Sequence, residues 1–159
     1  MDSKIKITTF ANENLYVDKN IICESPILKE ALDKSENGEI IIDLPFDILE
    51  IVFTFYENHK HEKEIEIKAP LNKQSQFQNF IDKKDYQMLE KLSLNKQQQL
   101  IQICNNLHYN QLMKITCASL ANKLQYMDTG AIRQMFNIQQ DQSREQLERI
   151  SLENKWLKE

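Results

Sequence analysis

The sequence IRQMFNI at residues 132–138 and the sequence ENKW at residues 153–156 say most about the fold of this chain. Each belongs to a short amphipathic stretch, and the polar turn QQD at residues 139–141 separates the two. Asp128 suits the N-cap of the first helix, and the second helix is expected to start near Asp141. The chain is therefore expected to end in two short helices.

These two helices carry large apolar side chains that need cover. The side chains are Phe136, Ile138, Leu152 and Trp156, of which Trp156 is the only tryptophan. Helices of about two to four turns cannot bury all of them among themselves. One interpretation is a groove for a partner helix, because tryptophan is enriched at the energetic centres of interfaces. The other is self-burial against the rest of the chain, and the residues alone favour neither.

The composition predicts a helical intracellular protein. At 159 residues, with two glycines and three prolines, the chain fits one domain, or one domain with an appendage, built mainly from helices. The net charge of −4 brings no basic patch for nucleic acid or for an anionic membrane surface. No apolar run is long enough to span a bilayer, and the first residues lack a secretion signal. We expect a location in the cytoplasm, the nucleus or both.

Three cysteines, Cys23, Cys104 and Cys117, are odd in number and far apart in the sequence. This favours reduced thiols over a disulfide framework. Each lies among apolar residues, which predicts buried and unreactive side chains.

The first sixty residues predict a small sheet with helices packed on it. Alternating residues 5–8 and 15–17 predict a two-stranded hairpin, and residues 39–43 a third strand. Ser25 is expected to cap a helix that begins with Pro26 and that buries Ile27, Leu28 and Leu32. Asp47 and Glu50 have capping-box spacing, which predicts that a long, mostly apolar helix starts at Ile48.

Residues 58–78 are polar and predict a mobile loop, in which residues 64–67 could pair as a strand. Helical patterns resume near Asp82. Three helices are expected, with apolar residues Tyr86, Leu89 and Leu92 on the first, Leu100, Ile101, Ile103, Cys104 and Leu107 on the second, and Leu112, Met113, Ile115, Leu120 and Leu124 on the third. In the last helix of the chain, Glu145 and Arg149 have the spacing of an ion pair. The predicted fold class is α+β with helices predominating, in which a small three-stranded sheet packs on helices.

No constellation of residues predicts catalysis. His59 and His61, with Glu62 and Glu64, do not have a standard zinc spacing, so a solvated loop is favoured over a metal site. His108 lacks a nucleophile and an orienting partner, and two glycines cannot build a phosphate loop. We therefore expect no enzyme, no cofactor, no metal and no small-molecule substrate.

Two segments resemble the C-terminus of the S-phase-kinase-associated (Skp) adaptor family. The first is the pattern Ile-Arg-x-x-Phe-Asn-Ile at residues 132–138, and the second is the Asn-x-Trp at residues 154–156. These adaptors are small bridging subunits of Skp–cullin–F-box (SCF) ubiquitin ligases. The resemblance runs through nearly the whole chain in order. It includes Ile5-Lys6-Ile7 at the first strand, Leu44-Pro45 before the long helix, and Thr116-Cys117 in a central helix.

The resemblance implies a BTB/POZ fold with two extra C-terminal helices. Residues 1–127 would form the BTB/POZ-like domain, with 58–78 as its variable polar loop, and residues 128–159 the extension that binds an F-box. Positions that match the family's F-box contacts are Ile101, Met113, Leu120, Ile132, Phe136, Ile138 and Trp156, with Leu152 one turn before Trp156. The cullin-facing match is Asn105-Asn106.

The chain departs from the family pattern near both partner surfaces. The family usually has Asn-Tyr where this chain has Asn105-Asn106, which removes an aromatic anchor. An aromatic usual near the F-box groove is replaced by Gln98. The chain thus resembles a divergent member of the family, in which the F-box-binding positions match the family pattern better than the cullin-facing positions do.

Two functions follow from the resemblance. The first is a non-enzymatic adaptor that bridges an F-box protein to a cullin in an SCF-type E3 ubiquitin ligase, in ubiquitin-dependent protein catabolism. The alternative is a structural subunit that binds an F-box-like partner in a larger assembly without a cullin.

Overall fold

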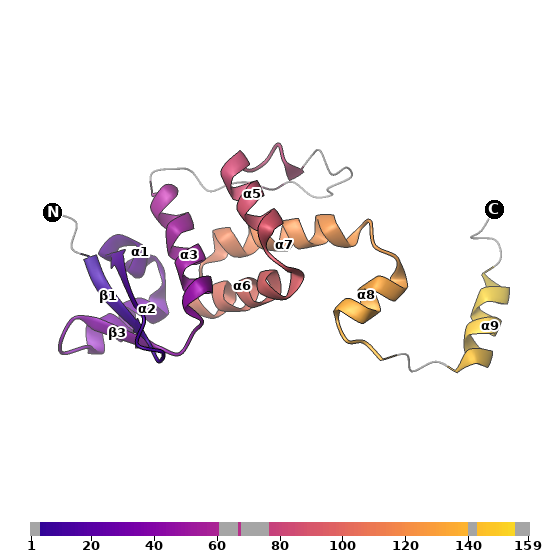
Figure 1. The fold of residues 1–159 in the computed structure, drawn as a ribbon, viewed down its shortest axis with the longest axis horizontal. Helices are drawn as coiled ribbons and strands as arrows, with labels where there is room; N and C mark the ends of the chain where they lie inside the picture. Colours follow the sequence, from indigo (N-terminus) through magenta and orange to yellow (C-terminus); the bar gives the residue numbers. More distant parts are fainter. Residues whose placement is uncertain (1–3, 61–66, 68–76, 140–142, 155–159) are drawn as a thin grey trace. The chain divides into compact units, whose positions relative to one another are not determined.

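The structure, a computed structural model, describes residues 4–60, 67, 77–139 and 143–154, and its packing divides the chain into two compact units, Met1–Gln125 and Tyr126–Glu159 (Figure 1). The described elements of the first unit are β1 (Lys4–Thr9), β2 (Asn14–Asp18), α1 (Lys19–Glu24), α2 (Pro26–Lys34), β3 (Glu39–Ile42), α3 (Phe46–Asn58), α5 (Lys83–Lys91), α6 (Leu94–Leu107) and α7 (Asn110–Leu124). Those of the second unit are α8 (Thr129–Met135) and α9 (Arg144–Glu153). The predicted fold class, a small three-stranded sheet with helices predominating, is confirmed.

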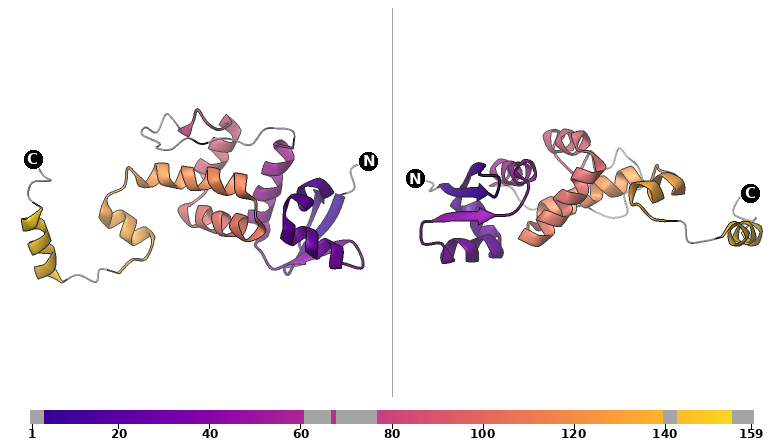
Figure 2. Two further views of the ribbon diagram at one scale, coloured as in Figure 1. Left: turned by 180° about the vertical axis from the view of Figure 1, so that it is seen from behind. Right: turned by 60° about the horizontal axis from the view of Figure 1, so that its bottom comes forward.

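The sheet has the strand order β2-β1-β3. β1 pairs antiparallel with β2 and parallel with β3, so the chain crosses over through α1 and α2 before it returns to the sheet. One face carries the buried side chains Ile7, Val17 and Ile40. Figure 2 shows α1 and α2 beside the sheet, which they contact. The sheet therefore closes one end of a mainly helical core.

Ser25 caps α2 as the sequence predicts. Its hydroxyl accepts a hydrogen bond from the Leu28 amide, and Pro26 occupies the first turn of the helix. Leu28 is buried, but Ile27 is 45% exposed. The prediction that Ile27 is buried is wrong, because a residue next to Leu28 points about 100° away from it around the helix.

α3 begins at Phe46, two residues before the predicted start. The carbonyl of Pro45 accepts the first helical bond from the Leu49 amide, and no side chain caps this end. The predicted capping box is therefore wrong. The Asp47 carboxylate instead lies 2.7 Å from the Lys96 ammonium of α6, which lowers the pKa of Asp47.

α6 and α7 form a helical hairpin, shown side by side in Figures 1 and 2. His108 joins them in a left-handed conformation with φ +60, and the amides of His108 and Tyr109 bond back to the last turn of α6. Tyr109 is buried, and its hydroxyl donates a hydrogen bond to the Ile21 carbonyl of α1 at 2.9 Å. Burial raises the pKa of Tyr109. This bond ties the hairpin to the helices that cover the sheet.

Replacing Tyr109 by phenylalanine is expected to lower the free energy of unfolding by about 1–2 kcal/mol, because the buried Ile21 carbonyl loses its partner. Urea unfolding of both proteins measures the difference. The control is Tyr16→Phe, whose side chain is 60% exposed on the sheet and should change stability by less than about 0.5 kcal/mol. An equal loss in both variants would contradict the role assigned to the Tyr109 hydroxyl.

The predicted polar loop at 58–78 falls largely outside the described residues, as does most of the possible strand at 64–67. Its first residues are described and are well anchored. The His59 ring lies 2.8 Å from the Asp85 carboxylate of α5, with both side chains buried. Lys60 pairs with Asp18 at 2.5 Å, which lowers the pKa of Asp18. The C-terminal end of α3 is thus fastened to α5 and to the sheet.

Cysteine burial agrees with the prediction at one position of three. Cys104 is fully buried, and desolvation raises the pKa of its thiol to about 12. Cys23 and Cys117 are exposed, so the prediction of three buried thiols is wrong for them. Both lie on helix positions that face away from the core.

Candidate functional site

The predicted partner-binding residues of the first unit lie on the α6–α7 hairpin. Ile101, Met113 and Leu120 are half-buried, beside fully buried neighbours such as Leu100 and Leu112. Met113 packs against the core, whereas Ile101 and Leu120 are not part of it. The hairpin therefore holds its apolar side chains on a rigid support. Of three consecutive glutamines on α6, the first is fully buried and Gln98 is half-buried.

α8 starts and ends with specific local bonds. The Asp128 carboxylate accepts a bond from the Ala131 amide, which confirms the predicted cap. At the other end Asn137 has φ +52, and the Ile138 amide bonds to the Arg133 carbonyl at 2.9 Å. The Asn137 amide bonds to the carbonyl of Gln134. This arrangement is a Schellman motif, in which a left-handed residue closes the helix.

The two residues on either side of Asn137 are exposed. Phe136 is 39% exposed and Ile138 is 55% exposed, while Ile132 one turn earlier is half-buried. The left-handed Asn137 thus ends the helix between these two exposed side chains. The sequence feature that indicates this helix end is the asparagine directly after the helical run.

α9 begins at Arg144 with a capping box, not at Asp141 as predicted. The Ser143 hydroxyl accepts from the Gln146 amide, and the Gln146 side chain accepts from the Ser143 amide at 2.8 Å. The predicted Glu145–Arg149 pair is wrong, because Arg149 pairs with Glu153 at 2.9 Å. The serine–x–x–glutamine spacing was present in the sequence and identifies this start.

The apolar side chains of α9 remain uncovered. Leu152 is 61% exposed and Ile150 is 42% exposed, while Leu147 is half-buried. Trp156 and Leu157 lie outside the described residues. Ile150 and Leu152 of α9, like Phe136 and Ile138 just after α8, therefore expose apolar surface.

Replacing Ser143 by alanine is expected to reduce the helix content of α9, because the bond from the Gln146 amide to the Ser143 hydroxyl is lost at a cost of about 1 kcal/mol. Backbone NMR shifts of residues 144–153 in the full chain measure the loss. The control Ser143→Asp retains an acceptor at the cap and should keep the helix. Unchanged shifts in the alanine variant would show that packing, not the cap, holds α9.

The predicted cullin-facing residues lie in the last turn of α6. Asn105 and Asn106 are both exposed, next to the left-handed His108. Tyr109, the nearest aromatic in the sequence, is buried and cannot stand in for an aromatic at position 106. This corner therefore presents polar amide side chains.

No described residue set suggests a metal site or a membrane span. Within residues 4–60, 67, 77–139 and 143–154, no group of three or more His, Cys, Asp or Glu side chains is placed to hold a metal ion. His61, Glu62 and Glu64, weighed above as ligands, lie outside these residues. No helix in the described part of the chain is long and apolar enough to cross a membrane.

Comparison with known proteins connects these surfaces to a family. The model of the "Skp1 family, dimerisation domain" matches residues 110–157, which include α7, α8 and α9. The "S-phase kinase-associated protein 1 homolog" of Tetrahymena thermophila is 27% identical over 159 residues, which cover 99% of this chain and 95% of that protein.

Two further relatives match over nearly their whole length. The "SCF ubiquitin ligase complex protein SKP1b" of Dictyostelium discoideum is 26% identical, over 97% of this chain and 95% of its own. The "Suppressor of kinetochore protein 1" of Schizosaccharomyces pombe is 30% identical, over 97% of each chain. Since the fold, the C-terminal block and this full-length similarity agree, the chain belongs to the Skp1 family.

Proposed function

We propose that this protein is a non-enzymatic adaptor that holds an F-box protein and presents it to a cullin in an SCF-type E3 ubiquitin ligase. The observation that carries the proposal is the row of exposed apolar side chains, Phe136, Ile138 and Leu152, within the part that matches the family model. The names of two relatives, an SCF ubiquitin ligase complex protein and an "E3 ubiquitin ligase complex SCF subunit", support it.

The F-box would bind to the residues matched above on α6 to α9 and to Trp156. An F-box is a short helical motif, and exposed apolar residues suit the apolar face of such a motif. Residues 128–159 would then act as the binding extension and residues 1–127 as the rigid part. The adaptor would work by positioning alone, since no step of the chemistry needs a residue of this chain.

A second function is favoured by one observation. Asn105 and Asn106 expose only amide groups on the corner proposed for the cullin. Interface centres are enriched in aromatic side chains, so this corner lacks an anchor. The alternative is a structural subunit that binds an F-box-like partner without a cullin.

Affinity purification of the tagged full chain from its own cells, followed by mass spectrometry, separates the two functions. An F-box protein recovered together with a cullin supports the ligase adaptor. An F-box-like protein recovered repeatedly without a cullin supports the structural subunit. If neither an F-box-like protein nor a cullin is recovered, both proposed functions are contradicted.

Substituting Asn106 by tyrosine is expected to raise the affinity for a cullin N-terminal region about tenfold or more, since an aromatic anchor is added to an exposed site. Biolayer interferometry with the purified cullin fragment measures the change. Asn110→Tyr, at an exposed position at the start of α7, is the matched control and should gain little. An equal gain in both variants would reveal nonspecific stickiness of the added ring.

A further inference from the structure

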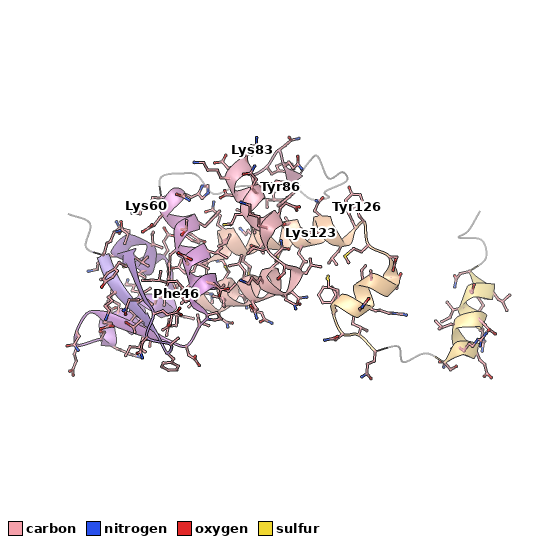
Figure 3. All side chains as sticks on the ribbon, viewed as in Figure 1. Phe46, Lys60, Lys83, Tyr86, Lys123 and Tyr126 are labelled. Atoms are coloured by element: carbon pink, nitrogen blue, oxygen red, sulfur yellow. The ribbon has the colours of Figure 1, made fainter. Side chains whose placement is uncertain are left out.

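A groove of about 240 Å³ lies in the first unit, between the β1–β2 turn and the connection from β3 to α3. Residues from both segments line it, among them Phe10, Glu13, Asp43, Leu44, Pro45 and Phe46. Figure 3 marks Phe46 at the start of α3. This volume is smaller than the roughly 300–1,000 Å³ of sites for drug-sized molecules, and suits one or two side chains.

The first wall of the groove is fixed by the geometry of the β1–β2 turn. Thr9 and Glu13 are joined by a bond from the Thr9 amide to the Glu13 carbonyl at 2.9 Å, and Asn12 has φ +61. A three-residue hairpin loop that ends in a left-handed residue is a well-defined turn. It holds the Phe10 ring in solvent, where it is 68% exposed.

The second wall is the start of α3. Pro45 has φ −61, and its carbonyl is bonded into the first helical turn. Leu44 packs against the core, and Phe46 is half-buried. Both walls are therefore formed before any ligand arrives.

The charges at the groove are exclusively negative. Glu13 and Asp43 are exposed, and neither forms an ion pair with any described residue, while no lysine or arginine lines the groove. The nearby Asp47 is already paired with Lys96 at 2.7 Å. Between residues 4 and 60 the carboxylates outnumber the lysines, eleven to six. An apolar floor with two unpaired carboxylates favours a cation on an apolar stem.

We propose that this groove binds an arginine side chain from an extended segment of a partner protein. The alkyl stem would lie on Leu44 and Pro45, and the guanidinium would lie against the exposed Phe10 ring. Its planar donors would reach the carboxylates of Glu13 and Asp43. Arginine is favoured over lysine because it combines stacking with paired hydrogen bonds.

The groove lies away from the corner of α6 proposed for the cullin. Its neighbour Lys96 lies in the first turn of α6, whereas Asn105 lies in the last. Nine residues of helix separate the two positions, about 14 Å. A basic segment could therefore occupy the groove while a cullin is bound at Asn105 and Asn106.

The test is an NMR titration of the full-length ¹⁵N-labelled chain with two capped pentapeptides that differ only in a central arginine or glutamine. The expected result is movement of the amides of residues 9–13 and 43–46 with the arginine peptide alone, with a Kd in the millimolar range. Equal movement with both peptides, or none at these amides, would overturn the proposal. Movement of the same amides on concentrating the chain without peptide would also overturn it, since a second copy would then fill the groove.

Variants locate the interaction. Glu13→Gln combined with Asp43→Asn should weaken binding of the arginine peptide about tenfold. The charge control is Glu57→Gln, which is exposed on α3 about 16 Å from Phe46 and should bind as the unaltered chain does. Phe10→Ala should weaken binding, and Tyr16→Ala, equally exposed on β2, should not. If the controls lose affinity as much as the groove variants, general charge or apolarity explains the binding and the proposal is wrong.

Discussion

Replacing Asp85 by alanine is expected to lower the free energy of unfolding by about 3 kcal/mol or more, the largest effect of a single polar substitution in this chain. The Asp85 carboxylate lies 2.8 Å from the His59 ring, and the side chains are only 8% and 5% exposed. Removing one member of a buried pair loses the bond between the two side chains and the opposite charge that offsets their burial. Urea unfolding followed by circular dichroism measures the loss.

The position of the His59–Asp85 pair explains why its loss should destabilise more than one helix. His59 follows the last residue of α3 and stacks on Phe55 with the ring centroids 4.4 Å apart. Asp85 lies in the first turn of α5. The pair therefore joins two helices that are separated by more than twenty residues of sequence. Its loss should loosen α5 against the core as well as remove one bond.

Two variants control this prediction. Asp82→Ala removes a carboxylate three residues earlier, where the side chain is exposed and caps no amide, and should cost less than about 1 kcal/mol. Asp85→Asn keeps an acceptor for the histidine and should lose less than Asp85→Ala. A loss for Asp82→Ala as large as for Asp85→Ala would show that charge on α5, and not the buried pair, matters.

Local signals in the sequence predicted most elements correctly. The caps of two helices depend only on nearby residues. Ser25 caps α2, which has Pro26 in its first turn, and Asp128 caps α8. Alternation at 5–8 and 15–17 predicted the hairpin, which the register Ile5 to Val17 confirms. These predictions succeed because the partners are a few residues apart.

The predicted capping box failed because α3 begins at Phe46, which places Asp47 inside its first turn and not at its cap. The Asp47 carboxylate accepts a bond from the Ile48 amide and pairs with Lys96, forty-nine residues later in the sequence. The parallel pairing of β1 with β3 and the bond from Tyr109 to Ile21 also join residues far apart in sequence. Periodicity along the chain contains no information on such partners.

The candidate site was placed by resemblance more than by pattern. Periodicity placed Phe136 and Ile138 on a helical segment but did not tell whether they would be covered. The structure shows that both are exposed, on either side of the left-handed Asn137. Two helix ends of this chain, at His108 and Asn137, use left-handed residues other than glycine, in keeping with a sequence that has only two glycines.

Phe136→Ala combined with Leu152→Ala is expected to weaken binding of an F-box partner about thirtyfold or more, equivalent to about 2 kcal/mol. Both side chains are exposed in the second unit, at 39% and 61%, so a partner can bury them. Truncating Leu152 removes little packing within the chain, and truncating Phe136 removes the contacts of a partly covered ring. The free energy of unfolding should therefore change by less than about 2 kcal/mol, and the free chain should stay folded. Isothermal titration calorimetry with the purified F-box segment, and urea unfolding of the free chain, measure the two quantities.

The matched control is Ile41→Ala, which truncates a side chain that is 67% exposed on the outer face of the sheet. It should leave the affinity for the F-box segment unchanged, because Ile41 belongs to no residue set proposed for that partner. If the double variant unfolds the free chain, Phe136 and Leu152 stabilise the fold and self-burial is the correct interpretation. If Ile41→Ala weakens binding as much as the double variant, the partner responds to exposed apolar area in general. Only loss of affinity with retained stability, confined to Phe136 and Leu152, identifies the second unit as a docking surface.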